Sequence, residues 1–293
     1  MILAAGIMLA SSCQEDPLSD QSVITVDDVD YTQFDHWLEE NYVNPYNIAF
    51  KYRYEEIEAD YNYYTVPVYY ETAVKFAHLV KHLCIEAYDE VGGINFTREY
   101  FPKMIFLIGD WEYKNNGTFI LGTAEGGRKI TLMGANYLDQ YLNSATSLNY
   151  YYFKTVHHEF THILNQTKSL PVDYQFVTGD TYVGGEWSNS PYNTDYLTRG
   201  YISAYSQEAY TEDFAEMLSM YVCNTPEQWA SWMTAAGTTG SELLSTKLEL
   251  VRSYMSETFN IDIDALRSAI HRRQNEVISG KIDLEDLTLN SEK

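Results

Sequence analysis

The stretch TVHHEFTHIL, residues 155–164, holds three of the seven histidines of the chain together with one glutamate. On an α-helix, residues four positions apart lie on one face and one turn from each other, so His158 and His162 can aim their ring nitrogens at one point. Glu159 lies beside this pair. The stretch therefore predicts a helix that presents a histidine pair on a polar face and packs by the apolar residues on its other sides, Val156, Phe160, Ile163 and Leu164.

The histidine pair and the glutamate have the spacing HExxH, in which two imidazoles bind Zn²⁺ and the glutamate reaches a water on the ion without displacing it. We therefore expect His158 and His162 to be metal ligands and Glu159 to be the general base. His157 has no second nitrogen four positions later, because Thr161 stands there. It is expected to support a ligand or to pack. The alternative, two surface histidines on an amphipathic helix, is set aside only by a third ligand.

The third ligand is expected from the stretch YSQEAYTEDFAEMLSMYVC, residues 205–223. Glu212 and Glu216 lie one turn apart on one face of the predicted helix. One carboxylate completes a zinc site of two histidines and one carboxylate, and a second can accept the free N–H of a ligating histidine. Glu212 is thus the predicted ligand and Glu216 the predicted partner of a ligand. The opposite face of this helix is apolar, with Phe214, Leu218, Tyr221 and Val222.

Other residues compete with Glu212 for the third position. Asp213 and Glu208 are close in the sequence, and an acidic helix start is also favoured by the helix dipole without any metal. The one histidine downstream of the motif, His271, stands in the charged stretch AIHRRQ and is expected to face solvent. The expected cofactor is one Zn²⁺ ion per chain, held by the histidine pair and Glu212.

The composition is typical of a packed globular protein. The 293 residues can bury a sizeable core, 45% of them are hydrophobic, and 27 are tyrosines. The 19 basic and 42 acidic residues give a formal charge of −23, which repels phosphate backbones and anionic lipid headgroups. Nucleic acid is therefore not an expected partner. Cys84 and Cys223 are expected to be buried free thiols, and a disulfide between them stays open.

The first residues, MILAAGIMLASSCQEDPLSD, are predicted to be a targeting segment. Their apolar run is too short to span a bilayer and turns into small residues before Cys13, which is similar to a bacterial lipoprotein signal that is cleaved to leave a lipidated cysteine. The run has no Lys or Arg at its start, and Ala10 stands where leucine is usual. Residues 14–29 are expected to be a flexible tether. A buried apolar segment is the alternative for residues 1–13.

Hydrophobic periodicity predicts an α+β fold for residues 30–293. Residues 30–150 are expected to form a mixed sheet with helices, and residues 151–293 to supply the active-site helices and a mainly helical C-terminal part. The glycine-rich and tyrosine-rich segment 171–201 is expected to be an ordered loop that forms a wall of the substrate cleft. The expected helices are 31–43, 69–93, 226–236, 241–259 and 263–278. The expected strands lie in 44–56, in 103–110 and, as a hairpin or a pair of neighbouring strands, in 117–135.

The combined motifs resemble a known family. HExxH followed some fifty residues later by EDFAE resembles the gluzincin metallopeptidases, and the seven-residue step from Tyr205 to Glu212 is similar to their lethal-factor-type branch. The blocks NPYNIAFKYRYEE, LGTAEGGRKITL, HHEFTHILNQT, GYISAYS and EDFAEM, between residues 44 and 217, resemble the Bacteroidetes substrate import-associated zinc metallohydrolase lipoproteins. This resemblance implies a zincin-like metallopeptidase fold with His158, His162 and Glu212 as ligands.

The resemblance also implies a function. We expect zinc-dependent hydrolysis of peptide bonds, with Glu159 as the base and Tyr205 as a donor to the developing oxyanion; Tyr201 and Tyr210 are alternatives for that donor. The family implies an outer-membrane lipoprotein, facing the cell surface or else the periplasm, that acts on a peptide or glycopeptide beside SusC/SusD-type import components. A strand of the predicted hairpin is expected to pair with the substrate. The alternatives are a non-catalytic surface binding protein and a zinc amidase for glycopeptides.

Overall fold

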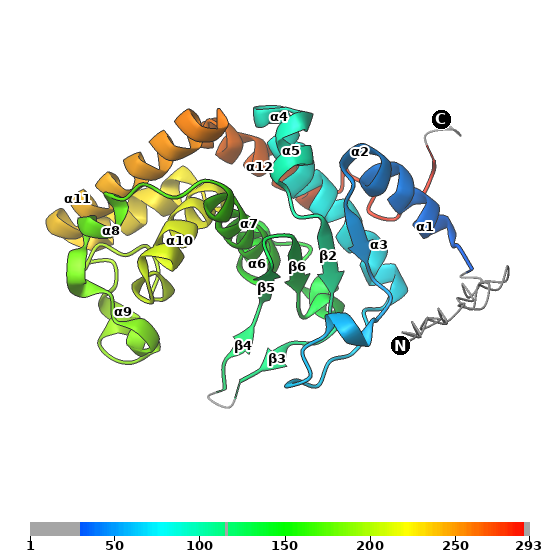
Figure 1. Cartoon of the computed structure of the whole chain (residues 1–293), viewed down its shortest axis with the longest axis horizontal. Helices are drawn as coiled ribbons and strands as arrows, with labels where there is room; N and C mark the ends of the chain where they lie inside the picture. The colour runs from blue at the N-terminus through cyan, green and yellow to red at the C-terminus, as the bar shows by residue number, and fades with distance from the viewer. Residues whose placement is uncertain (1–29, 115–116, 290–293) are drawn as a thin grey trace, which may run out of the picture.

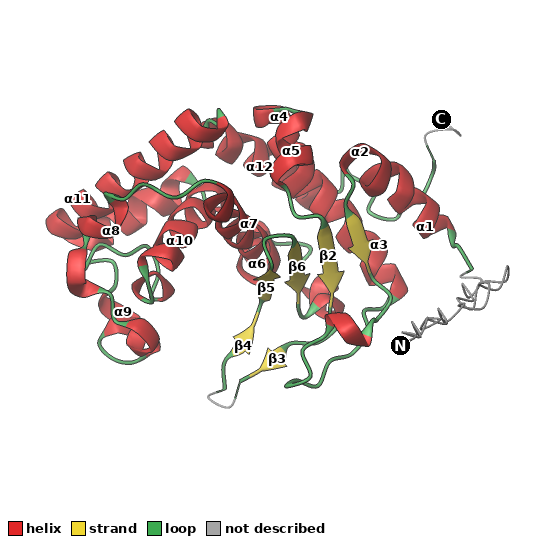
Figure 2. Cartoon of the chain, in the orientation of Figure 1, coloured by secondary structure: helices red, strands yellow, loops and turns green. Residues whose placement is uncertain are grey.

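The computed structural model describes residues 30–114 and 117–289. The predicted signal segment, its Cys13 and the tether 14–29 lie outside these residues. Figure 1 shows a curved molecule in which a small sheet, flanked by the helices of the first half of the chain, is followed by a region built from the later helices. The strands are confined to the first half of the chain and helices dominate the rest, as the colouring in Figure 2 makes clear. The fold is α+β, as predicted.

The main helices and all strands of the described residues have the following bounds. The helices are α1 Gln33–Leu38, α2 Asn44–Tyr46, α3 Tyr70–Val80, α4 Glu86–Gly92, α5 Ile94–Tyr100, α6 Ala145–Leu148, α7 Lys154–Thr167, α8 Tyr174–Val177, α9 Tyr192–Asp195, α10 Tyr210–Cys223, α11 Pro226–Phe259 and α12 Ile263–Ile278. The strands are β1 Ala49–Lys51, β2 Met104–Leu107, β3 Glu112–Tyr113, β4 Phe119–Ile120, β5 Gly122–Glu125 and β6 Lys129–Leu132.

Four strands form a mixed sheet in the order β1-β2-β6-β5. Strands β1, β2 and β6 run parallel, and β5 pairs antiparallel with β6, with Thr123 opposite Thr131. The predicted hairpin is confirmed: Gly126 and Gly127 both have positive φ angles in the turn, which glycine adopts without steric cost. Strand β5 is the last strand in this order, so one of its edges stays unpaired within the described sheet. Strands β3 and β4 form a separate antiparallel ribbon.

The first predicted strand is shorter than expected. Sequence alternation indicated a strand over residues 44–56, whereas only Ala49–Lys51 is one. Pro45 stands in the first turn of α2, where proline is tolerated, and Asn47 has a left-handed backbone (φ 55°) that ends this helix. The helical stretch that begins at α1 therefore runs on to Tyr46, and the strand keeps only the residues that pair with β2.

The helical predictions hold well in the second half of the chain. Helix α12 has the predicted bounds, and α11 joins the two predicted helices 226–236 and 241–259 across a kink at Gly237, whose φ is 66°. The segment 171–201, predicted as a loop, contains short helical turns such as α8 and α9. Helix α3 continues through a π-helical turn into α4 and ends before Gly93, in agreement with the predicted long helix.

Helix α7 lies between the sheet and the later helices, and it carries the histidine motif. It packs against β5 and β6 on one side and against α10 on the other. The four apolar residues that predicted this helix, Val156, Phe160, Ile163 and Leu164, are all buried. A side chain at Gly122 would come within 2.7 Å of Thr155 on α7, so glycine is what lets β5 approach the motif helix this closely.

The described residues also test two minor predictions. Cys84 and Cys223 are buried and free, in agreement with the thiol interpretation. Within residues 30–114 and 117–289, no helix combines the length and the apolar character that crossing a membrane requires.

Candidate metal centre

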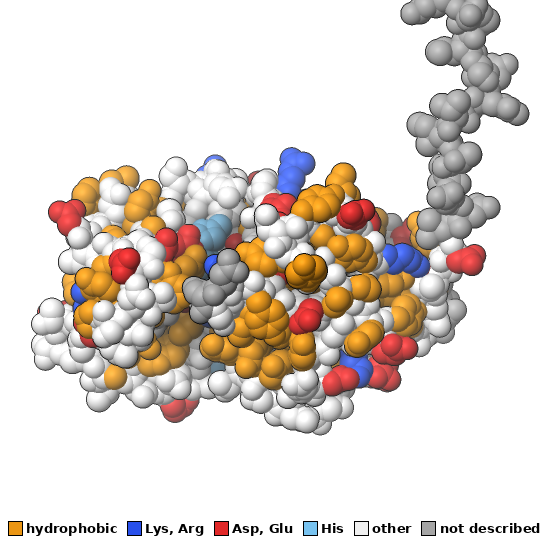
Figure 3. All heavy atoms as spheres, turned by 90° about the horizontal axis from the view of Figure 1, so that it is seen from below, with side chains coloured by type: hydrophobic (Ala, Val, Ile, Leu, Met, Phe, Trp, Pro, Cys, Tyr) orange, Lys and Arg blue, Asp and Glu red, His pale blue; other side chains and the backbone are white. Residues whose placement is uncertain are grey.

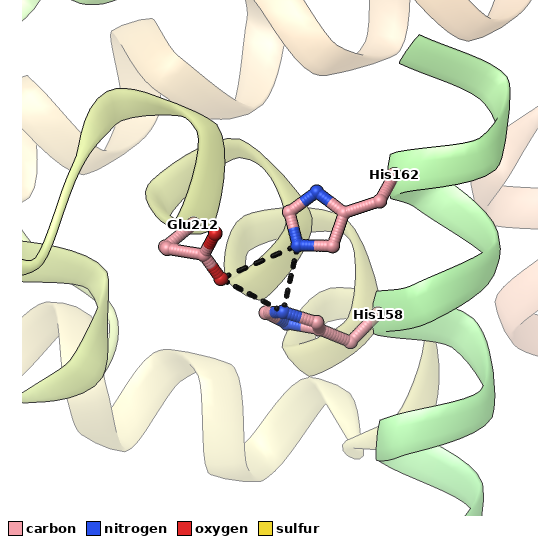
Figure 4. A group of neighbouring side chains, drawn as sticks. All are labelled: His158, His162 and Glu212. Atoms are coloured by element: carbon pink, nitrogen blue, oxygen red, sulfur yellow. Dashed lines mark hydrogen bonds and ion pairs between the residues drawn. The ribbon is translucent and has the colours of Figure 1, made fainter. Parts of the chain in front are cut away.

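The structure brings together the three predicted metal ligands. His158 and His162 project from successive turns of α7, and Glu212 reaches them from the first turn of α10 (Figure 4). The two Nε2 atoms lie 3.1 Å apart, and Oε2 of Glu212 lies 3.2 Å from Nε2 of His158 and 3.3 Å from Nε2 of His162. Among the described residues this is the one group of three or more side chains placed to share a metal ion.

The spacing of these three atoms suits a zinc ion. Atoms bound to zinc at roughly 2.0–2.1 Å with tetrahedral angles lie about 3.3 Å from one another. The three distances of 3.1–3.3 Å agree with that value. Two imidazoles and one carboxylate also leave one tetrahedral position open, as catalytic zinc sites do. The donor set therefore fits Zn²⁺ in both chemistry and geometry.

The protonation of His158 gives a second reason for a cation at this place. Its Nδ1 lies 2.8 Å from Oε1 of Glu216, and because an ionised carboxylate only accepts hydrogen bonds, the proton stands on Nδ1. The lone pair of Nε2 then faces the carboxylate of Glu212. Burial disfavours the charged ring, but the bonds to Glu212 and Glu216 outweigh it and raise the pKa of His158 to about 9. In the metal-free protein a proton takes the place that the ion would fill.

Glu216 occupies the position that the sequence predicted, next to a ligand. Its side chain is buried, and both of its oxygens are engaged: Lys154 donates to Oε1 at 2.7 Å, and the hydroxyl of Ser203 donates to Oε2 at 2.7 Å. Burial raises the pKa of Glu216, but the charge of Lys154 and the bond to His158 outweigh burial and hold it well below the usual range. Glu216 is therefore an ionised acceptor that orients the His158 ring.

Glu159 lies beside the ligands and has few partners of its own. Its side chain lines the cleft together with His162 and Glu212. Burial raises the pKa of its carboxyl, while the charges of His158 and His162 oppose that shift. A carboxyl with a raised pKa, next to the open metal position, is suited to taking a proton from water and giving it up again.

His157 takes the packing role of the two roles predicted for it. Its ring is fully buried, and its Nδ1 lies 3.1 Å from the hydroxyl of Tyr88 on α4. Burial lowers the pKa of His157 to about 4, so the ring is neutral at pH 7. Its contacts are with the core, and it supports the metal centre only by fixing α7.

The structure separates the three tyrosines proposed as oxyanion donors. Tyr205 lines the cleft, and its ring centre is 6.0 Å from that of His158. Tyr201 is buried, with its hydroxyl 2.7 Å from that of Thr181, and so is engaged elsewhere. Tyr210 is partly exposed and borders the cleft next to Glu212. Burial, followed by the charge of Glu212, raises the pKa of Tyr205, which keeps its hydroxyl protonated as a donor.

The alternatives for the third ligand position, Asp213, Glu208 and His271, do not join the group of His158, His162 and Glu212. Asp213 is fully buried and pairs with Lys247 at 2.6 Å. His271 does not face solvent, as the charged stretch around it had indicated; it is half-buried, and burial lowers its pKa. The helix that carries His271, α12, packs against α10 and α4. The prediction of exposure from the charged neighbours of His271 was therefore wrong.

The metal centre opens into a cleft. Two adjoining hollows of about 660 and 540 Å³ share Glu159, His162 and Glu212. Residues of β5 form one side, and the segment 171–201 contributes to the other through Val172, Gln175 and Trp187, as expected from the sequence. In Figure 3 acidic and histidine side chains come to the surface near the middle of the lower face, with hydrophobic side chains gathered to both sides.

Two residues of the site were missed by reasoning from the sequence. Lys154 stands four positions before His158 on the same helix, and this spacing could have placed it next to Glu216. Ser203 lies outside any helix or strand and carries no such signal.

Comparison with known proteins agrees with this site. A family model described as "Putative zinc-binding metallo-peptidase" matches residues 27–264. A crystal structure described as a putative zinc-binding metallo-peptidase from Bacteroides caccae is similar, with 44% sequence identity and a TM-score of 0.76 over 87% of this chain and 96% of that chain. A search of curated proteins found no match. The chain belongs to the family of zinc-binding metallopeptidases that this model describes.

Proposed function

We propose that this protein is a zinc-dependent peptidase that hydrolyses peptide bonds with Glu159 as its general base. The observation that carries the proposal is the set of three donor atoms of His158, His162 and Glu212, 3.1–3.3 Å apart, with the Glu159 carboxyl beside them in an open cleft. A site that only binds has no need of a carboxyl at that place. The alternative is a protein that binds peptides without cleaving them, and the peptide-library experiment distinguishes it from a peptidase.

The residues of the chain divide the work of hydrolysis. A zinc ion at this site supplies a Lewis acid that activates water and polarises the carbonyl group of the substrate. Glu159 takes a proton from the attacking water as the new C–O bond forms, and it gives the proton to the amide nitrogen when the C–N bond breaks. The hydroxyl of Tyr205 donates to the oxygen of the carbonyl group as negative charge develops there.

The edge of β5 supports a peptide as the substrate. Its unpaired backbone groups border the cleft, and Gly122 brings the strand close to α7. An extended peptide can add to such an edge by backbone hydrogen bonds, which are independent of the substrate sequence. This geometry would lay a peptide alongside Glu159. A glycopeptide fits the same chemistry as long as its glycan points away from the strand.

We further propose that the protein acts as an outer-membrane lipoprotein, anchored through Cys13 and facing the cell surface, beside SusC/SusD-type import components. The support is the N-terminal sequence and the family resemblance. The test is Cys13→Ser in the full-length chain in a bacterial host. The variant should move from the membrane fraction to the soluble fraction, and unchanged membrane association would contradict the anchor.

The peptidase proposal is tested with a peptide library. The purified protein, loaded with one equivalent of zinc, is incubated with the library, and cleaved bonds are identified by mass spectrometry. Cleavage should appear with zinc, disappear after dialysis against a chelator, and return when zinc is added back. A zinc-loaded protein that binds peptides but cleaves none would favour the non-catalytic binding protein. Cleavage restricted to sugar-bearing peptides would favour the glycopeptide amidase.

A further inference from the structure

A second cavity lies across strand β5 from the metal centre. It has a volume of about 290 Å³, which is room for roughly ten water molecules or one long side chain. A side chain at Gly122 would meet Thr155 on α7, so the alternation of a strand turns Thr123 and Glu125 toward the opposite face, and both of these residues line this cavity. The lining residues are Glu58, Ala59, Asp60, Tyr63, Ile108, Glu112, Ile120, Thr123, Ala124, Glu125, Thr131 and Met133.

Two polar side chains of the cavity are buried without partners. Glu112 on β3 is 3% exposed, and within the described residues its carboxylate makes no hydrogen bond or ion pair. Thr131 on β6 is also 3% exposed, and its hydroxyl has no hydrogen-bond partner. Buried polar groups are normally satisfied, so both groups are placed to take hydrogen bonds from a polar group that enters the cavity.

The cavity also has an excess of negative charge. Lys129 pairs with Glu58 at 3.1 Å and with Glu125 at 2.8 Å. Glu112 and Asp60 have no such cation among the described residues. Burial, followed by the charges of Asp60 and Glu125, raises the pKa of Glu112 to about 7. A side chain that enters the cavity is therefore expected to carry positive charge.

The shape of the cavity favours an organic cation over a metal ion. A calcium ion needs six to eight oxygens at about 2.3–2.6 Å, but three acidic groups of this cavity do not come close enough to share one ion. The remaining walls include apolar side chains of Ile108, Ile120 and Met133. Such walls suit the methylene chain of a lysine or arginine, whose charged end would meet Glu112.

The cavity is placed to receive a side chain from a peptide on the β5 edge. Ile120, Thr123 and Ala124 line both this cavity and the metal cleft. A peptide that pairs with β5 sends alternate side chains to the two faces of the sheet. One set would point toward α7 and the metal centre, and the other would point toward the face that carries Thr123 and Glu112.

We propose that the cavity between Glu112, Asp60 and Thr131 is a specificity subsite that takes the lysine or arginine side chain of a peptide bound along β5. This inference rests on the proposed peptidase function and names a substrate class for it. The charged end of the side chain would neutralise Glu112, and its methylene chain would be buried against the apolar walls of the cavity. The substrates would accordingly be peptides with a basic residue at one fixed position from the cleaved bond.

The test measures binding to the zinc-loaded Glu159→Gln protein, so that it does not depend on turnover. The probes are a peptide cleaved in the library experiment and versions of it with lysine or norleucine at each of the six positions around the cleaved bond. Norleucine keeps the methylene chain and removes the charge. At one position, at pH 8, lysine should bind about tenfold or more tightly than norleucine, as expected for a buried charge pair.

Further substitutions in this protein locate the effect. Glu112→Gln should abolish the preference for lysine, and Asp60→Asn, which changes an exposed residue, should reduce it. Glu56→Gln removes a charge from the same segment outside the cavity and should leave the preference unchanged. Thermal unfolding of each variant checks that it is folded. The Asp60→Asn result keeps the test decisive if Glu112→Gln does not fold.

Four outcomes would overturn the inference. Equal binding of lysine and norleucine at every position, or a preference that survives Glu112→Gln, would remove the subsite and leave the peptidase proposal intact. A library experiment in which the zinc-loaded protein cleaves no peptide would remove both, because the inference rests on the peptidase. Stabilisation of the wild type, but not of Glu112→Gln, by millimolar calcium chloride would show that an inorganic cation fills the cavity in place of a side chain.

Discussion

Helix α10 carries two buried carboxylates, Glu216 and Asp213, each of which is paired with a lysine. The two carboxylates differ in their other hydrogen-bond partners. Glu216 pairs with Lys154 and uses both oxygens, with His158 on the same oxygen as the lysine and Ser203 on the other. Asp213 uses only Oδ2, which takes bonds from Lys247 and Tyr182, while Oδ1 has no partner among the described residues. The first pair touches His158, a predicted metal ligand, and the second does not.

The two pairs also differ in the pKa values of their members. The pKa of Glu216 stays well below its usual range because its bonds and the charge of Lys154 outweigh burial. The pKa of Asp213 is raised and that of Lys247 lowered, because burial outweighs their mutual attraction. These two carboxylates of one helix therefore have different roles. Glu216 orients His158 of the candidate metal centre. Asp213 joins α10 to α11 and to the segment that ends at Gly200, whose carbonyl also accepts from Lys247.

The largest expected effect is on stability and comes from the second pair. Lys247→Met leaves the charge of Asp213 buried and unpaired, which should lower the free energy of unfolding by about 3–5 kcal/mol. Denaturant unfolding of the metal-free protein measures this. The double variant with Asp213→Asn should recover most of the loss, and Lys168→Met, at an exposed lysine, should change little. If Lys247→Met lowers the free energy of unfolding no more than Lys168→Met does, the pair does not stabilise the fold.

Glu216→Gln should weaken zinc binding by about 10–100-fold, because the amide is a poorer acceptor for the His158 N–H. Competition with a chelator of known affinity measures the change. The matched control is the double variant Asp213→Asn with Lys247→Met, which makes the same kind of substitution one turn earlier on α10 without leaving an unpaired charge and should alter zinc affinity by less than about threefold. Equal losses of zinc affinity in the two variants would contradict the claim that only the Glu216 pair supports the metal site.

The pH dependence of zinc binding sharpens the comparison further. Because the pKa of His158 is about 9 without metal, zinc must displace one proton, and its affinity should rise about tenfold per pH unit between pH 7 and 9. In the metal-free protein this raised pKa stabilises the fold fully below about pH 6.5, the ordinary pKa, and this stabilisation is lost as the pH rises through about 9. Titrations at several pH values measure the slope, and a flat profile would contradict it.

The smallest expected effect is that of Ser203→Ala. The hydroxyl gives Glu216 one hydrogen bond of 2.7 Å, and its loss should cost about 1 kcal/mol of stability and at most about threefold in zinc affinity, because Lys154 remains. The same assays apply. A loss of zinc affinity as large as that of Glu216→Gln would mean that Ser203, rather than the lysine, fixes the position of the carboxylate.

The sequence predicted what depends on local spacing. Positions 158, 159 and 162 follow from the turn of one helix, and Glu212 with Glu216 from the turn of another, so the side chains that could share a metal ion were predictable once both helices were recognised. The apolar residues of α7 were also predicted correctly, because burial follows helical periodicity. The hairpin was predictable because its Gly-Gly turn admits positive φ angles.

Features that depend on tertiary contacts were not predictable. Ser203 reaches Glu216 only through the path of the chain between α9 and α10, and no spacing indicates it. The exposure predicted for His271 was wrong because the packing of α12 overrides the charge of its neighbours. The strand predicted over residues 44–56 was too long because alternation continues past the residues that have a partner strand.

The most direct test of the central claim is the rate of peptide hydrolysis by Glu159→Gln, compared with wild type at equal zinc content. The variant should bind one zinc ion per chain and lose about 10²–10⁴-fold in kcat, the range expected for a general base. Glu257→Gln, at an exposed position on α11, should match wild type. A zinc-loaded Glu159→Gln protein that hydrolyses the peptide at the wild-type rate would contradict the account.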